Sequence, residues 1–377
     1  MQFKTIKDIQ NLRGKKVLLR LDFNVPITDG TLRDDFRIKK SLDTLNFLRD
    51  SGAKTIIISH IESIETKSLK IVYDYLSKSF NIKFAKDYFG ERTEKSISEM
   101  KDGDFLLLEN IRIYEGEEKN SEHFAEQLAT LGEIYVNEAF SVSHRKHSSI
   151  VGVPKFLPSY AGILFEEEVM NLSKAFNPEH PFLFILGGAK FETKMPLIEK
   201  FLKLADFVFV GGALANDFFR EKGYETGLSV VSPKKFDLKK ITASDKLLLP
   251  VDVVVKNNQG VFIKRPSQVL REDKILDAGP ATISMLEEKL HSSKFVLWNG
   301  PLGDYEKGFR EGTIELAKTI AKSRAKSIIG GGDTLAVVSK LGLENKFSFI
   351  STGGGAMLDF LANGTLHGIE ALERSSG

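Results

Sequence analysis

Short runs of consecutive apolar residues alternate with helix-spaced apolar patterns along the whole chain. Residues 105–108 read FLLL, residues 182–186 read FLFIL, and residues 207–210 read FVFV. Strands of this kind are apolar on both faces, which is typical of a parallel sheet that helices cover on both sides. The alternation therefore predicts an α/β protein built on parallel sheets.

The predicted elements fall into two groups, before and after a helix expected over residues 166–176, which Asn177-Pro178 ends. We place the boundary between two α/β domains on this helix, at residues 165 and 166. Residues 229–268 are less regular. The expected strands are 15–21, 54–59, 105–108, 134–136, 182–186, 207–210, 295–297, 327–329 and 347–350, and the other expected helices include 38–51, 69–76 and 124–131.

Composition limits the classes of function. The 377 residues are 42% hydrophobic and 28% charged, which is ordinary for a soluble globular protein. The net charge of +2 gives no global attraction to nucleic acid or to a membrane. The absence of cysteine excludes disulfides, thiolate metal sites and cysteine nucleophiles. Residues 1–8 lack the apolar core of a signal peptide, and no apolar run is long enough to span a bilayer. We expect a cytoplasmic protein.

Four turns in the second half join a strand to a helix through glycine, at Gly187, Gly211, Gly330 and Gly353. Because α/β sheets bind ligands at the carboxyl ends of their strands, these turns predict a glycine-lined crevice. None of them spells G-x-G-x-x-G/A, and G-x-x-x-x-G-K-[ST] is also absent.

The turn at residues 330–334 (GGGDT) is the clearest candidate site. Its glycines let an oxyanion approach the first free N–H groups of the following helix. Asp333 would repel a phosphate unless a cation lay between them, so it indicates Mg²⁺. The alternative is a tight turn with Asp333 or Thr334 as N-cap. Lys190 and Lys194 would project from one helical face beside a phosphate, or else be solvated surface lysines.

In the first half, cationic and polar side chains follow successive strands. Arginine forks suit a small ligand that carries both carboxylate and phosphate. Each of these residues alone would be a surface charge, but their repetition at the carboxyl ends of one sheet favours a ligand site. No further His or Cys cluster accompanies His144 and His147, so we do not predict zinc. The candidates are Asp22, Asn24, Arg37, His60, Arg112 and residues 144–147.

Seven motifs together resemble the phosphoglycerate kinase family, in family order and across residues 5–372. They are 17–26 (VLLRLDFNVP), 107–112 (LLENIR), 144–149 (HRKHSS), 186–190 (LGGAK), 298–301 (WNGP), 330–334 (GGGDT) and 351–356 (STGGGA). The resemblance implies two Rossmann-like domains joined by a hinge helix, with a C-terminal tail from about residue 366 that packs back on the N-terminal domain. The nucleotide domain would then cover residues 166–365.

The resemblance also implies a monomeric glycolytic enzyme of the kinase and transferase class. It would move a phosphoryl group reversibly between 1,3-bisphosphoglycerate and ADP, giving 3-phosphoglycerate and ATP, with Mg²⁺ and with closure of the hinge. The implied triose ligands are Asp22, Asn24, Arg37, His60, Arg112 and Arg145. The implied nucleotide ligands are Lys194, Glu306, Gly330, Gly331, Gly332, Asp333 and Thr334, with Asp333 toward Mg²⁺ and Glu306 toward the ribose. The implied catalytic groups are Arg37, Lys190 and the helix N-termini at Gly331 and Gly354.

The chain departs from the family pattern at several positions. The family reads Ser-His-Leu-Gly-Arg-Pro where residues 59–64 read SHIESI, so a triose-binding arginine is missing. A charge-assisted hydrogen bond is worth ~1.5–3 kcal/mol, so we expect triose affinity to fall roughly 10- to 150-fold unless Lys67 compensates. Ile275 replaces a glycine, Asp304 a valine, and Ser141-Val142 a Gly-Thr pair. These changes leave two alternatives open: a kinase of the same fold for another small phosphorylated carboxylate, or a non-catalytic nucleotide-binding regulator.

Overall fold

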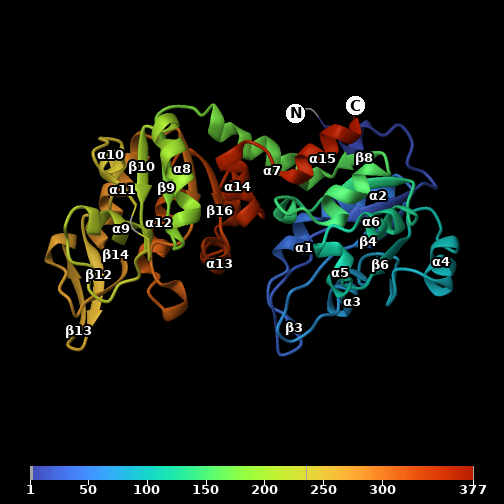
Figure 1. The fold of residues 1–377 in the computed structure, drawn as a ribbon, viewed down its shortest axis with the longest axis horizontal. Helices are drawn as coiled ribbons and strands as arrows, with labels where there is room; N and C mark the ends of the chain where they lie inside the picture. The colour runs from blue at the N-terminus through green and yellow to red at the C-terminus, as the bar shows by residue number, and fades with distance from the viewer. Residues whose placement is uncertain (1–2, 235, 377) are drawn as a thin grey trace. The chain divides into compact units, whose positions relative to one another are not determined.

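Two six-stranded parallel sheets organise the chain, one in each of its two units (Figure 1). The computed structural model describes residues 3–234 and 236–376. Unit 1 comprises residues 1–170 and 363–377, and unit 2 comprises residues 171–362. The prediction of an α/β protein with parallel sheets is confirmed.

The sheet of unit 1 has the strand order β5-β6-β4-β1-β7-β8, and every neighbouring pair is parallel. Its strands are β1 (Lys16–Arg20), β4 (Lys54–Ile58), β5 (Ile82–Ala85), β6 (Phe105–Leu108), β7 (Ile134–Asn137) and β8 (Ser159–Ala161). The chain passes from β1 to β4 on one side and later returns to β7 on the other. The order therefore reverses at β1, where an α/β sheet opens a crevice.

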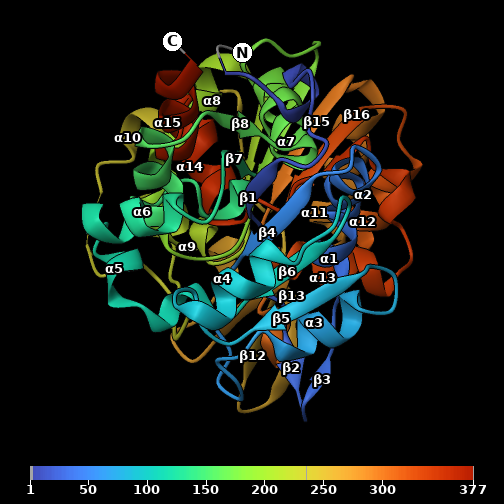
Figure 2. The same cartoon turned by 90° about the vertical axis from the view of Figure 1, so that its right-hand side faces the viewer.

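Alternate residues of these strands pack against helices on opposite faces of the sheet. Leu19 belongs to a core cluster with Leu45 and Val72, whereas its neighbour Leu18 packs in a second cluster with Phe124. Figure 2 shows the two helical layers on either side of the strands. The helices are α1 (Phe36–Lys40), α2 (Leu42–Asp50) and α3 (Lys70–Leu76) on the first face, and α4 (Glu91–Ser98), α5 (Glu115–Glu118) and α6 (Glu122–Ala129) on the second.

The sheet of unit 2 has the order β11-β10-β9-β15-β16-β17, again with every pair parallel. Its central strands β9 (Phe182–Leu186) and β15 (Phe295–Asn299) are buried along their whole length, as their continuous apolar sequences require. The outer strands are β10 (Phe207–Val210), β11 (Leu247–Leu248), β16 (Lys326–Gly330) and β17 (Phe349–Ile350). The helices are α8 (Phe191–Leu204), α9 (Leu214–Glu221), α10 (Lys239–Thr242), α11 (Pro280–Ser292), α12 (Glu311–Lys322), α13 (Gly332–Lys340) and α14 (Gly355–Asn363).

Two strands of an antiparallel sheet lie in the second part of residues 229–268, the region with a less regular sequence pattern, and the sequence analysis did not predict them. The strands β12 (Val253–Asn257), β13 (Gly260–Lys264) and β14 (Lys274–Ala278) pair in the order β13-β12-β14 (Figure 1). Val253 and Val255 face a small core with Phe219. The alternation was hidden because β13 exposes apolar side chains, so apolar residues occupy both faces of the hairpin.

The bounds of two predicted helices differ most from those observed. The helix expected over 38–51 is divided at Ser41 into α1 and α2. The Ser41 hydroxyl donates to the carbonyl of Arg37 (3.0 Å), a local bond that competes with the helical ladder. The helix expected over 166–176 is α7 (Ile163–Ser173), followed by a 3₁₀ turn at Lys174–Phe176.

The remaining elements belong to unit 1. The strands β2 (Ile27–Thr28) and β3 (Thr31–Leu32) form a small hairpin. The last helix, α15 (His367–Ser376), packs on unit 1: the N–H of Gly368 donates to the carbonyl of Ser143 (2.8 Å). Over the described ranges, every helix is too short or too polar to cross a membrane.

Candidate active site

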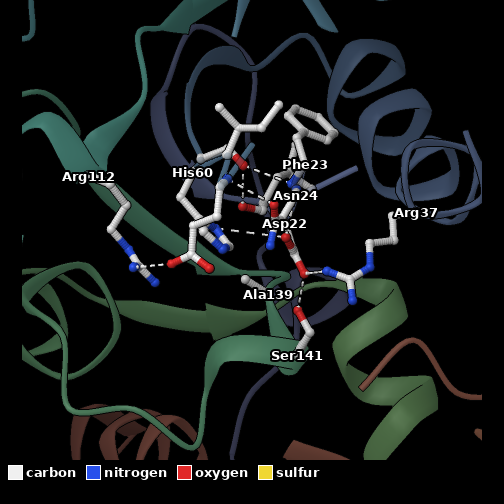
Figure 3. A network of polar contacts seen from close by, with 12 residues as sticks. Asp22, Phe23, Asn24, Arg37, His60, Arg112, Ala139 and Ser141 are labelled. Carbon is white, nitrogen blue, oxygen red and sulfur yellow. Dashed lines mark hydrogen bonds and ion pairs between the residues drawn. The ribbon is translucent and has the colours of Figure 1, made fainter. Parts of the chain in front are cut away.

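The carboxyl end of β1 and its two neighbours hold the polar centre of unit 1. Asp22 follows β1, His60 follows β4, and Ser141 follows β7. Because the three strands are parallel and adjacent, these side chains meet at one edge of the sheet (Figure 3).

Asp22 is the acceptor at the centre of this cluster. Its Oδ2 accepts hydrogen bonds from the Arg37 guanidinium and the Ser141 hydroxyl, and its Oδ1 accepts from the N–H of Asn24 (2.9 Å). Burial alone would raise the pKa of Asp22, but the charge of Arg37 and the hydrogen bonds outweigh burial and hold the pKa below its ordinary value. Asp22 is therefore a fixed carboxylate that orients Arg37.

Arg37 lies in the first turn of α1 and points toward Asp22 (Figure 3). About one third of its side chain is exposed (33%), whereas that of Asp22 is 9% exposed. The guanidinium has five N–H donors in a planar fork, and Asp22 engages only one of its nitrogens. The rest of the fork can bind an anion.

His60 is buried and uncharged. Its Nδ1 lies 3.8 Å from Asp22 Oδ1 and 3.4 Å from Arg20 Nη2. Burial lowers the pKa of His60 to about 3, and the neighbouring arginines add to that effect while Asp22 opposes it. At neutral pH, His60 can therefore offer a hydrogen bond to a ligand but not a positive charge.

Arg112 and Arg145 form a second cationic group, which Glu62 links. Asn110 caps the 3₁₀ turn that carries Arg112, and its Oδ1 accepts from the N–H of Arg112 (3.1 Å). The Arg112 Nη1 is paired with Glu62 and Glu118, and Arg145 Nη1 lies 3.9 Å from Glu62 Oε1. Figure 3 shows Arg112 and Arg37 approaching the cluster from opposite sides.

The structure thus brings together the six triose-site candidates in two linked groups. Asp22, Arg37 and His60 form the first. Arg112 and Arg145 form the second, and Asn24 connects the groups because its Oδ1 accepts from the N–H of Glu62 (2.9 Å).

Sequence reasoning did not assign a role to Glu62, to the Ser141 hydroxyl or to the buried Arg20. Glu62 and Ser141 both replace residues of the family pattern. These replacements were the feature of the sequence that could have identified them as site residues. Arg20 belongs to a buried network in which Ser149 accepts from its Nε (2.8 Å) and donates to Glu117 (2.5 Å). An arginine in the middle of an apolar run was the corresponding signal, because a buried charge needs partners.

In unit 2, the strand order reverses between β9 and β15, and two glycine turns pack against each other there. The N–H of Gly187 donates to Asn299 O (2.8 Å), and that of Gly188 donates to Pro301 O (2.7 Å). A Cβ at Gly187 would lie 2.2 Å from Pro301 O, a distance too short for any side chain. These glycines are required by the close approach of two backbones.

Lys190 and Lys194 do not share a helical face, so that prediction was wrong. Lys190 precedes α8 in a left-handed conformation (φ 62°) and is exposed, whereas Lys194 lies inside the helix and is buried. The Lys194 Nζ donates to Gly187 O (2.6 Å). Burial, reinforced by Lys190, lowers the pKa of Lys194 to about 8, although Asp333 opposes the shift. Lys194 is thus held directly beneath the glycine turn.

The turn at residues 330–334 opens α13 with its glycines in place. Gly331 occupies the N-cap position with φ 99°, and no side chain caps the helix. Neither Asp333 nor Thr334 is therefore the N-cap, so that part of the alternative was wrong. Asp333 is exposed in the first turn, while Thr334 is buried and its Oγ1 has no partner among the described residues. The first N–H groups of α13 remain open to an anion.

A cavity of about 250 Å³ lies beside these turns, within unit 2. One part of its wall is apolar, with Phe219, Val230 and Leu276, and another part carries the acidic side chains Glu306 and Asp333. Ile275 and Asp304, two of the departures from the family pattern, also line it. An apolar wall next to an anion site suits a nucleotide, whose base and phosphates need different surroundings.

The oxygen ligands at this site fit a magnesium ion that enters together with a nucleotide. In the part of the chain that the structure describes, no three His, Cys, Asp or Glu side chains cluster as a metal site. Mg²⁺ is commonly held by one or two carboxylates together with substrate phosphates and water. The exposed carboxylate of Asp333, at the mouth of the anion site, matches that pattern.

Comparisons with known proteins agree across nearly the whole chain. The sequence profile of the phosphoglycerate kinase family matches residues 6–364. The phosphoglycerate kinase of Dictyoglomus turgidum is 41% identical over 394 residues (99% of this chain and 100% of the relative), and that of Borrelia garinii is 40% identical over 395 residues with the same coverage. The solved structure of phosphoglycerate kinase from Coxiella burnetii matches with a TM-score of 0.84 at 33% identity, and that from Pyrococcus horikoshii with 0.85 at 31%; both comparisons cover 99% of each chain.

The fold and these likenesses define a phosphotransferase that uses a carboxyl group as acceptor. Within that class, the chain belongs to the phosphoglycerate kinase family. The family resemblance that the sequence motifs indicated is therefore confirmed, and with it the assignment to the glycolytic kinases.

Proposed function

We propose that the protein transfers a phosphoryl group between 1,3-bisphosphoglycerate and ADP in a magnesium-dependent reaction. The observation that carries this proposal is the pair Asp22–Arg37 at the switch point of unit 1, because it fixes an arginine with free donors at the edge of the sheet. Family membership supplies the substrates.

Unit 1 would hold the triose. Arg112 and Arg145 would bind its phosphate, and Arg37 would face the carboxyl end, where the transfer occurs. Asp22 would act through Arg37, while the neutral His60 and the Asn24 amide would contribute uncharged hydrogen bonds.

Unit 2 would hold the nucleotide. The N–H groups at Gly331 and Gly332 and the ammonium of Lys194 would bind its phosphates, with Gly330 and Thr334 shaping the turn. Glu306, at the rim of the cavity, would accept hydrogen bonds from the ribose hydroxyls. Mg²⁺, which neutralises charge on the nucleotide phosphates, would be held by Asp333.

The chemistry needs no covalent enzyme intermediate. In the direction of ATP synthesis, the bond from phosphorus to the carboxyl oxygen breaks as a bond to the β-phosphate oxygen of ADP forms. Arg37, Lys190 and the helix N-termini at Gly331 and Gly354 would neutralise charge on the equatorial oxygens. Because water would hydrolyse the acyl phosphate, we also propose that the units close about the helix α7 when both substrates are bound.

Finer properties belong to the same proposal. The net charge of +2 favours small-molecule substrates over nucleic acid or membrane surfaces as partners. We propose that the protein acts as a monomer in the cytoplasm.

A coupled assay of 3-phosphoglycerate-dependent ATP consumption tests the proposal. Arg37→Ala should abolish turnover, whereas Arg49→Ala, an arginine of α2 paired with its neighbour Asp50, should leave it unchanged. Absence of turnover in the unaltered protein at saturating triose would reject the proposed reaction. Equal loss in both variants would remove the role given to Arg37.

A further inference from the structure

Glu62 contacts both of the arginines that we assign to the triose phosphate. Its carboxylate is paired with Arg112 Nη1, and its Oε1 lies 3.9 Å from Arg145 Nη1. The family resemblance gave this loop a glycine followed by an arginine, whereas the chain has Glu62 followed by Ser63. The loop has therefore lost a cation and gained an anion at the anion site.

The backbone of Glu62 is fixed from both sides. Its N–H donates to Asn24 Oδ1 (2.9 Å). The preceding residue, Ile61, accepts from Asn110 Nδ2 (2.9 Å) and donates to Asn110 Oδ1 (3.3 Å). The same Asn110 caps the turn that carries Arg112, so carboxylate and guanidinium are positioned by one side chain.

The Glu62 carboxylate can rotate away from the arginines without any movement of this backbone. The side chain of Glu62 is 47% exposed, whereas that of Arg112 is 10% exposed. The Nε and Nη2 atoms of Arg112 are buried and have no hydrogen-bond partner among the described residues. Arg112 therefore pairs with carboxylates through Nη1. An incoming anion that binds Nη1 must displace one of those carboxylates.

We propose that Glu62 is an internal competitor of the anionic substrate. In the empty site its carboxylate bridges Arg112 and Arg145, and it rotates into solvent when a phosphate takes its place. A phosphate dianion carries more charge than a carboxylate, so the arginines attract it more strongly and it can displace Glu62. A monoanion of similar shape is attracted less strongly and displaces Glu62 less readily. Glu62 therefore sets the affinity for the triose and favours ligands that carry a phosphate. This inference rests on the proposed function for the identity of the ligand.

Glu62→Gln keeps the size of the side chain and removes its charge. We expect the dissociation constant for 3-phosphoglycerate, measured by calorimetry, to fall about tenfold, with an equal fall in the triose KM. The kcat and the KM for MgATP should not change, because the variant alters only the competition at the triose site.

Two matched variants control for a general effect of charge. Glu65→Gln removes an anion from the same loop, but Glu65 contacts the N–H groups of Asp29 and Gly30 rather than an arginine, so affinity should stay as in the unaltered protein. Glu118→Gln removes the other partner of Arg112 and should have a smaller effect than Glu62→Gln, because Glu118 forms an ion pair with Arg112 whereas Glu62 also lies near Arg145.

The possible outcomes test the inference separately from the proposed function. An unchanged or weaker affinity in Glu62→Gln, or an equal gain in Glu65→Gln, would overturn the competition. Inorganic phosphate serves as a second probe that does not depend on the reaction. If no variant turned over 3-phosphoglycerate but Glu62→Gln still bound phosphate more tightly, the proposed function would fail and the competition would stand.

Discussion

Asp22 and Arg37 form an ion pair that joins the end of β1 to the first turn of α1. The Ser141 hydroxyl, from the turn after β7, donates to the same carboxylate oxygen as Arg37. Three separate elements thus determine where one guanidinium points. This pair links the order of the strands to the chemistry proposed for unit 1.

Asp22→Asn should misplace Arg37 while leaving it in the site. An amide cannot form the ion pair, and a displacement of about 1 Å in a catalytic group can lower the rate about 100-fold. We therefore expect kcat for 3-phosphoglycerate to fall by about that factor, with MgATP binding unchanged. Steady-state kinetics and calorimetry would measure the two effects. Asp35→Asn, which affects the ion pair with Lys39 and the hydrogen bond from the Tyr75 hydroxyl, is the control. Full activity of Asp22→Asn would show that Arg37 does not need its partner.

Lys194 should make nucleotide binding depend on pH. Burial lowers the pKa of Lys194 to about 8, so the free enzyme loses this charge as pH rises through that value. The phosphates of a bound nucleotide would favour the charged form, so binding above about pH 8 should take up a proton. Calorimetry of MgATP binding at pH 8.5, in buffers of different ionisation enthalpy, measures this uptake directly.

The matched variant is Lys194→Met, which should bind MgATP more weakly and without proton uptake. Lys200→Met serves as the control, because its ammonium bonds the carbonyls of Leu361 and Ala362 at the end of α14. Proton uptake that persists in Lys194→Met would assign the effect to another group.

Much of this arrangement could be predicted from the sequence, for a physical reason. A buried parallel strand needs a continuous apolar run, so the strands and their ends were visible, and Asp22, His60 and Arg112 stand just beyond those ends. The contacts made by Glu62 and Ser141 could not be predicted, because they depend on how loops from different strands meet. The hairpin β12–β13 was missed since its exposed face is apolar and hides the alternation.

His60 should contribute a pH dependence of stability rather than of charge in the site. Its pKa is about 3 in the folded protein and near 6.5 when unfolded, so the unfolded chain binds the additional proton between these values. The free energy of unfolding should therefore fall as pH decreases from about 6.5 toward 3. His60→Gln should flatten this decline, whereas His123→Gln, at an exposed position of α6, should not. Urea unfolding at several pH values measures the decline in stability for both variants. If NMR showed that His60 titrates near pH 6.5, the low pKa of His60 would be contradicted.

Gly187 and Gly332 should respond differently to the same substitution. A Cβ at Gly187 would lie 2.2 Å from Pro301 O, a backbone atom that cannot move independently, while a Cβ at Gly332 would meet nothing within 4 Å. We expect Gly187→Ala to destabilise unit 2 by about 1–3 kcal/mol, the usual cost of overpacking. Gly332→Ala should keep its Tm and instead raise the KM for MgATP, because a methyl group would stand where a phosphate approaches the start of α13. Thermal unfolding and kinetics together separate the two roles: an unchanged KM in Gly332→Ala would mean that the nucleotide phosphates do not use this helix N-terminus.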